Sequence, residues 1–435
     1  MLTVQCRCGE TYHAEESHTG RKLRCRRCGR TLVVRAPKVP AGRRLRGRAR
    51  AWAGALRPRR AARAAADARA KPGARGPKPG AGRLAARLAA AVAWTQRGRA
   101  GRLRRWTGIA CVAYLAGAVL AAALLWGLGD AWWPATVLLF SGRWVLLLPL
   151  ALLVPAALAL LHGRALLALA AAAATLLFPV MGLRVHRERS EYGVEGVPGR
   201  VRIVTLNADD SRRVAYDLPV LLEVWRPDVV AFQECRQTLA LAVRAMRGWY
   251  RHAAGDELCL LSRYPIERAD AMDRSALADV RAASTIGGAG YVVRYALRLP
   301  GGTVHLTNLH LETPRKGFEA VMRGSLRGLS GNTELRGIES RLARRWAERD
   351  GGPVLVAGDF NTPVESRIYR AAWGDLANAF SAAGRGFGYT RHNGWIHVRI
   401  DHVLAGRGWR VLRAVVGDDV GSDHRPLVVD VAPER

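Results

Sequence analysis

The stretch VLVAGDFNTP at residues 354–363 joins a short apolar run to a polar end. Apolar residues at 354–357 predict a buried strand, and a glycine, an acid and an amide follow it. Asp359 and Asn361 are therefore expected at the rim of a buried sheet. Side chains at such a rim can converge on one cleft while the strands hold them rigid.

Similar runs predict further strands at 202–206, 229–232, 258–261, 291–299, 304–309, 400–404 and 426–431. Several of them also end in polar residues: Asn207, Glu234 and His310 follow strands, and Asp423 and His424 precede the last one. Amphipathic helical patterns alternate with these strands. Together they predict an α/β domain over about residues 200–433.

Five motifs stand in a fixed order in this domain: QE at 233–234, LSRYPI at 261–266, NLH at 308–310, GDFNTP at 358–363 and GSDHRP at 421–426. Their order resembles that of the endonuclease/exonuclease/phosphatase superfamily. The resemblance implies a four-layered α/β sandwich of two facing sheets. It also implies hydrolysis of phosphodiesters or phosphomonoesters with Mg²⁺ or Mn²⁺.

The resemblance implies a metal site. Glu234 matches the family's metal-binding glutamate, Asn207 the asparagine beside it, and Asp423 a further ligand. Asp209 matches an acid near a second metal position in some members, although a solvated turn is an almost equal alternative. Phosphate oxygens repel nucleophiles, so a hard cation held by carboxylates is needed to neutralise their charge.

The resemblance also implies catalytic residues. Asp359 and Asn361 match the pair that positions the attacking water and the phosphate. His424 and His310 match histidines that contact the phosphate, and Asp401 matches the acid that orients His424. Either Asp359 or His424 is expected to act as the general base, and the sequence does not choose between them.

The formal net charge of +33 is distributed unevenly. Residues 1–106 hold 29 Lys and Arg against 4 acids, residues 107–183 hold 2 against 1, and residues 184–435 hold 37 against 30. The excess belongs mainly to the amino-terminal arm. Bulk basicity therefore does not favour nucleic acid as the substrate of the α/β domain.

Two close cysteine pairs, Cys6 with Cys8 and Cys25 with Cys28, have the spacing of a tetrahedral zinc site. Residues 1–35 resemble a zinc ribbon with a short strand at 31–34. The alternative is four unrelated thiols. Bound Zn²⁺ would be structural and would require a reducing compartment.

Residues 36–106 hold 21 Lys and Arg and one acid, which predicts a basic disordered linker. Leu84, Leu88 and Val92 recur at helical spacing, as in a helix that lies on anionic lipid. RNA binding and plain solvation are the alternatives.

Three apolar runs at 107–128, 144–161 and 165–183 predict transmembrane helices within residues 107–183. No cleavable signal peptide precedes them. The dense arginines before the first run place the amino terminus in the cytoplasm. Three spans in the inner membrane would then place the catalytic domain on the other side, where a Cys235–Cys259 disulfide is as consistent with the sequence as two separate thiols.

We expect a membrane-anchored, metal-dependent phosphohydrolase that acts on a phosphoester, with a lipid-linked phosphoester as the favoured substrate. A membrane-anchored nuclease is the alternative within enzymes. A non-catalytic scaffold with a degenerate enzyme domain is the alternative outside them. The segment 313–317 is expected either to grip phosphate or simply to start a helix.

Overall fold

The computed structural model describes residues 2–5, 11–14, 22–24, 31–33, 79–186, 191–254, 257–277 and 290–434. The chain divides into two compact units, Met1–Leu84 and Ala85–Arg435. Each unit is described by itself below.

The first unit contains two antiparallel hairpins. Strand β1 (Leu2–Gln5) pairs with β2 (Thr11–Ala14), and β3 (Lys22–Arg24) pairs with β4 (Thr31–Val33). Strand β4 confirms the short strand predicted at 31–34. The predicted zinc ligands Cys6, Cys8, Cys25 and Cys28 lie outside the described residues, as does the linker up to residue 78.

A helical region follows the linker. Its elements are α3 (Pro79–Thr95), α4 (Gly98–Ala123), η4 (Leu124–Leu128), η5 (Gly129–Ala131), α5 (Trp133–Phe140), η6 (Arg143–Leu147), α6 (Leu150–Ala159), α7 (Gly163–Thr175) and η7 (Leu176–Val180). Helix α3 covers the helical pattern predicted at 84–92. By length and composition, Gly98–Ala131 and Gly163–Val180 can each cross a membrane. Trp133–Phe140 and Arg143–Ala159 pass the same criteria as a pair bent by 93°, which makes two or three candidate spans among the described residues.

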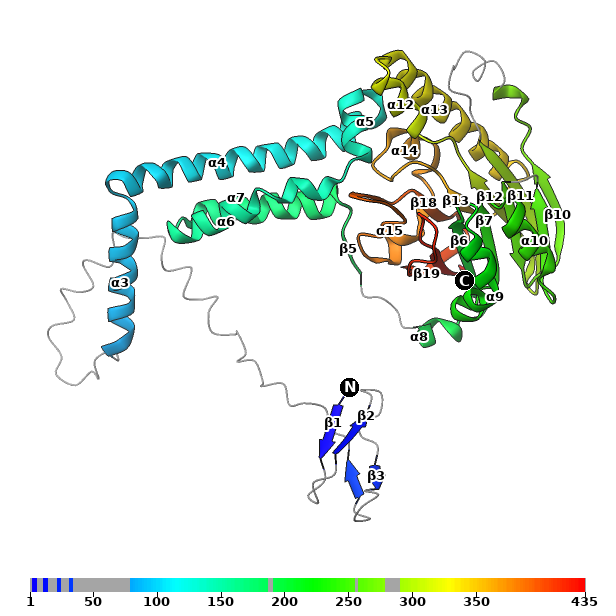
Figure 1. Cartoon of the computed structure of the whole chain (residues 1–435), viewed down its shortest axis with the longest axis horizontal. Helices are drawn as coiled ribbons and strands as arrows, with labels where there is room; N and C mark the ends of the chain where they lie inside the picture. The colour runs from blue at the N-terminus through cyan, green and yellow to red at the C-terminus, as the bar shows by residue number, and fades with distance from the viewer. Residues whose placement is uncertain are drawn as a thin grey trace. The chain divides into compact units, whose positions relative to one another are not determined.

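Helices α4 and α7 run side by side in the same direction, and α6 runs back along them in the opposite direction (Figure 1). At one end, His162 in the turn between α6 and α7 lies against Gly108 of α4. At the other end, the indole Nε1 of Trp126 donates a 2.9 Å hydrogen bond to the carbonyl oxygen of Pro179. The first turns of α4 and the α6–α7 turn therefore share one end, and α5 lies at the opposite end.

The rest of the second unit is built on two six-stranded sheets. The first sheet has the order β19 (Trp409–Val416), β20 (Leu427–Pro433), β6 (Val201–Asn207), β7 (Val229–Gln233), β9 (Leu258–Ser262), β8 (Tyr250–Ala254). The second has the order β10 (Ile266–Ala271), β11 (Tyr291–Leu299), β12 (Gly302–His310), β13 (Val354–Asp359), β18 (Asp401–Ala405), β14 (Ala377–Asn378). Only the β6–β7 and β12–β13 pairs within these two sheets are parallel.

The two sheets face each other across one core, to which both contribute, for example Ile203 and Val429 from the first and Tyr295 and Leu355 from the second. Helices α9 (Arg212–Trp225) and α10 (Gln237–Ala245) cover the outer face of the first sheet. Helices α13 (Leu326–Glu348) and α14 (Arg367–Trp373) cover the outer face of the second. The layers are thus helix, sheet, sheet and helix, and the predicted α/β fold is confirmed.

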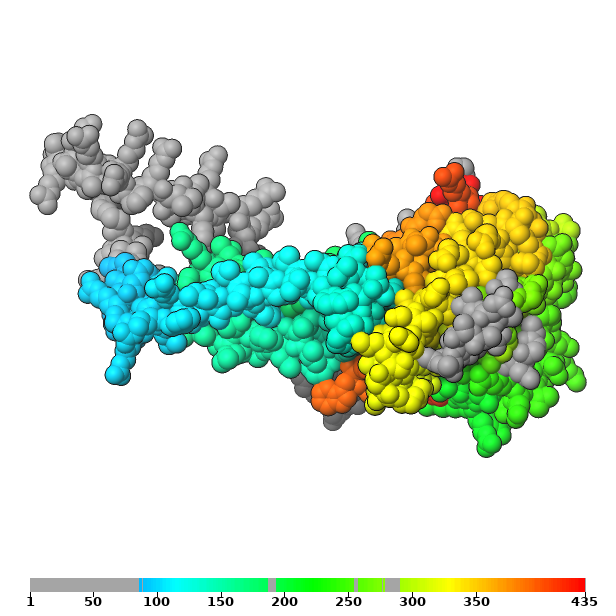
Figure 2. All heavy atoms as spheres, turned by 90° about the horizontal axis from the view of Figure 1, so that it is seen from above, coloured from blue at the N-terminus to red at the C-terminus, as the bar shows by residue number. Residues whose placement is uncertain are grey.

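Shorter elements connect these layers. They are α8 (Glu191–Glu195), η8 (Ser275–Leu277), α12 (Arg315–Met322), α15 (Ala379–Ala383), the pair β5 (Arg184–Val185) and β15 (Arg385–Gly386), and the hairpin β16 (Arg391–Asn393) and β17 (Ile396–Val398). Cys235 and Cys259 form a disulfide, so of the two alternatives left open by the sequence the structure contains the paired form. The helical region abuts the yellow and orange segments that contain α12, α13 and α14 (Figure 2).

Candidate active site

Polar side chains meet where strands of both sheets end. In the first sheet, the parallel strands β6 and β7 place Asn207 opposite Gln233, so Glu234 follows immediately. In the second sheet, His310 is opposite Asp359 across the parallel pair β12–β13. Strand β18 begins at Asp401, which is also opposite Asp359. These strand ends form one rim, which we call the catalytic rim.

Asn207 connects the two sheets at the rim. Its Nδ2 donates hydrogen bonds to Oε1 of Glu234 at 3.2 Å and to Oδ2 of Asp359 at 3.1 Å. Its Oδ1 accepts a 3.0 Å hydrogen bond from the backbone N–H of Asp209. Because Asn207 and Asp359 are buried, one amide fixes the separation of two carboxylates that belong to different sheets.

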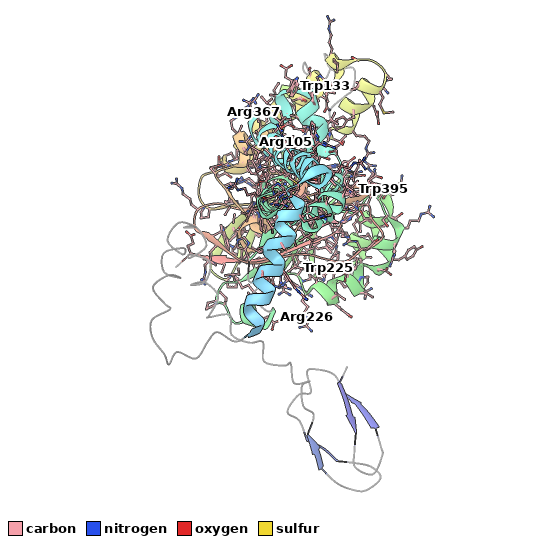
Figure 3. All side chains as sticks on the ribbon, turned by 90° about the vertical axis from the view of Figure 1, so that its left-hand side faces the viewer. Arg105, Trp133, Trp225, Arg226, Arg367 and Trp395 are labelled. Carbon is pink, nitrogen blue, oxygen red and sulfur yellow. A yellow bond between two sulfur atoms is a disulfide. The ribbon has the colours of Figure 1, made fainter. Side chains whose placement is uncertain are left out.

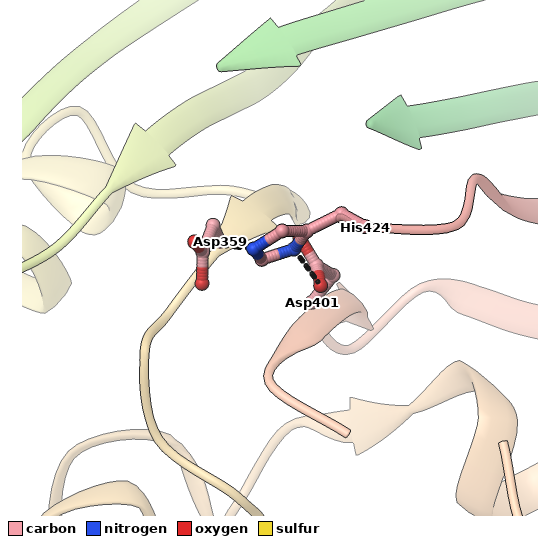
Figure 4. Close-up of side chains that lie close together, drawn as sticks. All are labelled: Asp359, Asp401 and His424. Atoms are coloured by element: carbon pink, nitrogen blue, oxygen red, sulfur yellow. Dashed lines mark hydrogen bonds and ion pairs between the residues drawn. The ribbon is translucent and has the colours of Figure 1, made fainter. Parts of the chain in front are cut away.

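His424 is oriented by Asp401, as Figure 4 shows. The Nδ1 of His424 lies 2.8 Å from Oδ2 of Asp401, and its Nε2 lies 3.8 Å from Oδ2 of Asp359. Burial alone would lower the pKa of His424, but the charges of Asp401 and Asp359 outweigh it and raise the pKa to about 9. All three side chains are buried.

The two carboxyls beside this histidine have pKa values shifted in opposite directions. Burial, and then the charge of Asp401, raise the pKa of Asp359. Burial would also raise the pKa of Asp401, but the charge and hydrogen bond of His424 hold it below its ordinary value. Asp401 is thus the partner that stays ionised, and Asp359 is the carboxyl with greater proton affinity.

Asp423 lies on the open side of His424, with 3.7 Å between its Oδ1 and Nε2 of the histidine. Arg391 of β16 donates a 2.6 Å hydrogen bond to Oδ2 of Asp423. Burial, and then the charges of Asp423 and Glu234, raise the pKa of Asp209. Asp209 is exposed and lies in a turn, as the solvated-turn alternative requires, but the charges of Asp423 and Glu234 still act on its carboxyl.

His310 lies between three acids. Its Nε2 is 3.9 Å from Oε1 of Glu234 and 3.8 Å from Oδ2 of Asp359, and its Nδ1 is 3.5 Å from Oε2 of Glu257. Burial would lower the pKa of His310, but Glu257, Asp359 and Glu234 together raise it. The rim therefore holds two imidazoles beside carboxylates, and the Nε2 atom of each lies 3.8 Å from Oδ2 of Asp359.

The backbone at the rim adopts left-handed conformations at residues other than glycine. The φ angles are 49° at Asp209, 48° at Asp210, 48° at Glu234 and 49° at Asn361. At Asn361 the backbone N–H donates to Oδ1 of Asp359 at 2.8 Å, and Nδ2 donates to the carbonyl oxygen of Leu311 at 2.8 Å. Such conformations persist only where surrounding contacts hold them, and they concentrate at functional sites.

The rim lies within a part of the chain that matches a known family. The family model described as the endonuclease/exonuclease/phosphatase family matches residues 205–424, slightly more than half of the 435 residues. The chain belongs to this family. As its name states, the family includes nucleases and phosphatases, which hydrolyse phosphoester bonds.

Solved structures with a similar fold come from bacteria and animals. An endonuclease/exonuclease/phosphatase family protein from Bacteroides thetaiotaomicron is 19% identical, with a TM-score of 0.42, over 55% of this chain and 100% of that one. D. rerio TDP2, solved with a single-strand DNA product, is 15% identical, with a TM-score of 0.40, over 53% and 98%. The human nocturnin catalytic domain, solved with a sulfate anion, is 16% identical, with a TM-score of 0.38, over 54% and 95%. No curated protein matches the chain.

The structure brings together the residues that the family resemblance selected. The rim contains Asn207, Asp209, Glu234, His310, Asp359, Asn361, Asp401, Asp423 and His424. In contrast, the segment 313–317 shows the helix-start alternative, because α12 begins at Arg315. Lys316 in that segment faces Glu312, with 3.1 Å between Nζ and Oε1. The start of α12 and this ion pair account for the segment 313–317 without a phosphate-binding loop.

The carboxylates of the rim fit a divalent metal ion. The family typically depends on divalent metals, and hard cations such as Mg²⁺ prefer oxygen ligands. Burial, and then the charges of Asp423 and Glu234, raise the pKa of Asp209, and a bound cation would relieve the repulsion between these acids. Asp359, Asp401 and His424 also offer atoms within 4.8 Å of one another. There, Nδ1 of His424 already makes a hydrogen bond with Asp401.

Three side chains of the rim lie outside the family motifs and were not predicted. Glu257 pairs with His310 and also accepts a 2.7 Å hydrogen bond from Arg236. Thr390 accepts hydrogen bonds from the backbone N–H groups of Ile400 and Asp401 through Oγ1. Arg391 reaches Asp423 from the β16–β17 hairpin. Glu257 and Thr390 lie in connecting segments and Arg391 in a three-residue strand, where no strand pattern marks them in the sequence.

Proposed function

We propose that the chain is a membrane-anchored, divalent-metal-dependent phosphohydrolase whose substrate is a phosphoester. The observation that carries this proposal is the catalytic rim. There, Nδ2 of Asn207 donates hydrogen bonds to both Glu234 and Asp359. The imidazoles of His310 and His424 each lie 3.8 Å from Asp359. A phosphate bound at this rim would lie near both carboxylates and imidazoles.

Glu234, Asn207, Asp209 and Asp423 are the residues that would hold Mg²⁺ or Mn²⁺. The ion would neutralise phosphate charge and polarise the bond that breaks. His424, whose pKa lies near 9, would donate a hydrogen bond to the developing negative charge. Asp359, with its raised pKa, has the proton affinity that a general base for water requires. This arrangement favours Asp359 as the base and His424 as the phosphate contact.

The helical region supports membrane anchoring. Leu152 of α6 is 75% exposed and Leu167 of α7 is 73% exposed, although both lie on apolar helices. Soluble proteins rarely leave such continuous apolar surface uncovered, whereas lipid would cover it. Trp133 at the start of α5 and Trp395 in the β16–β17 hairpin, both labelled in Figure 3, are also exposed. Trp395 stacks on Trp144 at 5.5 Å, as in an aromatic belt at a membrane surface.

Two observations support an extracytoplasmic catalytic domain. The basic residues Arg102, Arg104, Arg105 and Arg164 lie at the end of the helices that is opposite to α5 and the sandwich. By the positive-inside rule this end faces the cytoplasm. The Cys235–Cys259 disulfide is the second observation, because disulfides persist in oxidising compartments. We therefore propose an inner-membrane protein with a cytoplasmic amino terminus and, on that side, a zinc-binding ribbon at Cys6, Cys8, Cys25 and Cys28.

The favoured substrate is a lipid-linked phosphoester. A sandwich held against the membrane meets lipid headgroups at high effective concentration. Residues 184–435 carry 37 basic against 30 acidic residues, a modest excess for a domain that would bind nucleic acid. Nuclease activity is the second candidate, because the family includes nucleases.

The test uses the full chain, purified in detergent with Mg²⁺. It compares phosphate release from a polyprenyl pyrophosphate with the cutting of linear and supercoiled plasmid DNA. The proposal predicts phosphate release that EDTA abolishes and intact DNA. Cut DNA without phosphate release would replace the proposal with the nuclease alternative. A reporter fused to the carboxy terminus and active only in the cytoplasm would contradict the proposed orientation.

A further inference from the structure

A cavity of about 260 Å³ lies between the catalytic rim and the helical region. Its rim end is lined by Asn361 and Arg391. Most of its walls are apolar, from Phe140 of α5, Phe318 and Met322 of α12, Ile396 and Val398 of β17, and Ile400, and the polar residues Thr313, Arg315, Glu319 and Asn393 complete the lining. Because α5 supplies one wall, the cavity joins the site to the segment proposed to lie at the membrane.

The cavity changes character along its length. At the rim end, Asn361 belongs to the site and Arg391 already contacts Asp423 and His424. Away from the rim, the rings of Phe140 and Phe318 meet edge to face at 5.8 Å. A ligand that fills the cavity therefore has an anionic end and an apolar end, as a phosphate on an alkyl or isoprenoid chain does.

We propose that this cavity binds the apolar chain of the substrate while its phosphate lies at Asn361 and His424. This inference rests on the proposed function and adds the place where the chain binds. The chain would leave the cavity past Met322, which is 89% exposed.

The test measures kcat/KM for matched esters that differ only in their chain. One pair is methyl and decyl p-nitrophenyl phosphate, and the other is methyl and decyl monophosphate. All are used with the full chain, Mg²⁺ and one fixed detergent concentration. The cavity predicts a decyl-to-methyl ratio of roughly tenfold or more, since each buried methylene favours binding. Phe318→Asp and Met322→Asp should bring this ratio down towards one.

Leu241→Asp is the matched control, because Leu241 is an exposed leucine of α10 on the far sheet. It should leave the ratio unchanged. A wild-type ratio near one, or an unchanged ratio in both cavity variants, would overturn the inference while leaving the proposed function intact. Failure to hydrolyse any of the esters would instead count against the proposed function. Because Met322 is exposed, its variant should fold even if Phe318→Asp does not.

A second observation concerns the contacts that hold Asn361. Arg336 of α13 is buried and donates a 3.0 Å hydrogen bond from Nη2 to the carbonyl oxygen of Asn361. Its Nη1 lies 3.5 Å from Oδ1 of Asp130 in η5, and its Cζ lies 5.2 Å from the ring centroid of Phe140. Arg336 therefore contacts the site through one nitrogen and the helical region through another.

The helical region also holds the segment that follows Asn361. Asp130 accepts a hydrogen bond from Oγ of Ser366 and a 3.4 Å hydrogen bond from the backbone N–H of Ile368. Arg143 of η6 pairs with Glu365 at 3.2 Å, and both side chains are buried. Buried charges of the helical region thus meet buried groups of the segment 361–368 at several points.

We infer that Asp130 is a positioning residue that acts through Arg336 on Asn361. Asn361 has a φ of 49° and needs surrounding contacts to keep it. Asp130 neutralises the buried guanidinium that makes one of these contacts. The helical region would then be part of the catalytic machinery as well as an anchor.

The test compares Asp130→Asn, Asp130→Glu and Arg336→Lys in the full chain. Asp130→Asn should lower kcat about tenfold or more with KM changed less than threefold, because Asn361 acts in turnover. Asp130→Glu should restore part of kcat. Arg336→Lys keeps the charge beside Asp130 but loses the fork that reaches both partners, so it should lower kcat like Asp130→Asn.

Asp375→Asn provides the control, because Asp375 pairs with Arg344 on the exposed surface away from the rim. It should leave kcat and KM unchanged. If kcat per folded molecule stayed within twofold of wild type in both Asp130→Asn and Arg336→Lys, the inference would be wrong. A loss of folded protein with unchanged kcat in the remainder would likewise assign Asp130 a purely structural role.

Discussion

The sandwich and the helical region place similar apolar side chains in opposite environments. In the sandwich, residues such as Ile203 and Leu355 fill the space between two sheets and are shielded from water. In the helical region, Leu152 and Leu167 are exposed over most of their surface. The proposed membrane anchoring predicts this difference, with water around the sandwich and lipid around the helices.

The largest expected effect tests the polar rim of the sandwich. His424→Ala should lower kcat about 1,000-fold, because a positioned acid–base or phosphate-binding group contributes roughly 100- to 10,000-fold. Asp401→Asn keeps the hydrogen-bonded geometry but removes the charge, so its loss should be smaller. Turnover of a chromogenic phosphoester measures both. If His424→Ala were as active as wild type, the catalytic rim would not be the active site.

The second prediction compares a lysine in each region. Leu152→Lys should destabilise the membrane-inserted chain by about 3 kcal/mol, since a lysine in the middle of a membrane helix is unfavourable by that amount. Val220→Lys, at an exposed position of α9, should change stability by less than about 0.5 kcal/mol. A membrane-insertion assay measures the effect of Leu152→Lys, and thermal unfolding measures the effect of Val220→Lys. Equal, small effects would show that water surrounds α6.

The third prediction concerns the disulfide of the sandwich. Reduction should lower the free energy of unfolding by about 3 kcal/mol, since a cross-link of Cys235 to Cys259 restricts the unfolded chain. The double variant Cys235→Ser/Cys259→Ser should be insensitive to reductant. Cys111→Ala, which changes a buried thiol of α4, should keep the wild-type response. Denaturation with and without reductant checks all three.

The smallest effect is a pH dependence of stability. Burial, with the charge of Arg399, lowers the pKa of His402 to about 4, whereas an unfolded histidine titrates near 6.5. Between these values the unfolded chain binds more protons, so stability rises with pH by about 1 kcal/mol per unit and is lost as pH falls. His402→Gln should have a shallower slope between pH 4 and pH 6.5. If His402→Gln and wild type had the same slope of stability against pH, the lowered pKa of His402 would not be the cause of the pH dependence.

The sequence predicted the central strands and missed edge strands. All eight predicted strands are present, as β6, β7, β9, β11, β12, β13, β18 and β20. The strands β8, β10 and β19, which were not predicted, lie at the edges of their sheets. Edge strands carry charged residues, as in Ile266–Ala271, which reads IERADA and is half exposed. Such alternation is weaker than the apolar run of a central strand.

The site residues also differ in whether the sequence predicted them, according to the elements that carry them. Asn207, Glu234 and Asp359 follow central strands, so their positions followed from the motifs. Glu257 and Thr390 reach the rim from connecting segments, Arg336 reaches Asn361 from α13, and Asp130 contacts Arg336 from η5. Their contacts depend on how distant elements pack, which a single sequence pattern does not encode.

The most direct test of the account is phosphoester turnover by the full chain in detergent. Hydrolysis of a chromogenic phosphodiester and a phosphomonoester is measured with Mg²⁺, with EDTA, and with Asp359→Ala in place of wild type. The account predicts turnover of at least one ester by wild type with Mg²⁺, and loss of that turnover on chelation and in Asp359→Ala. Turnover that neither EDTA nor Asp359→Ala changes would contradict it, as would a folded wild-type chain that hydrolyses neither ester.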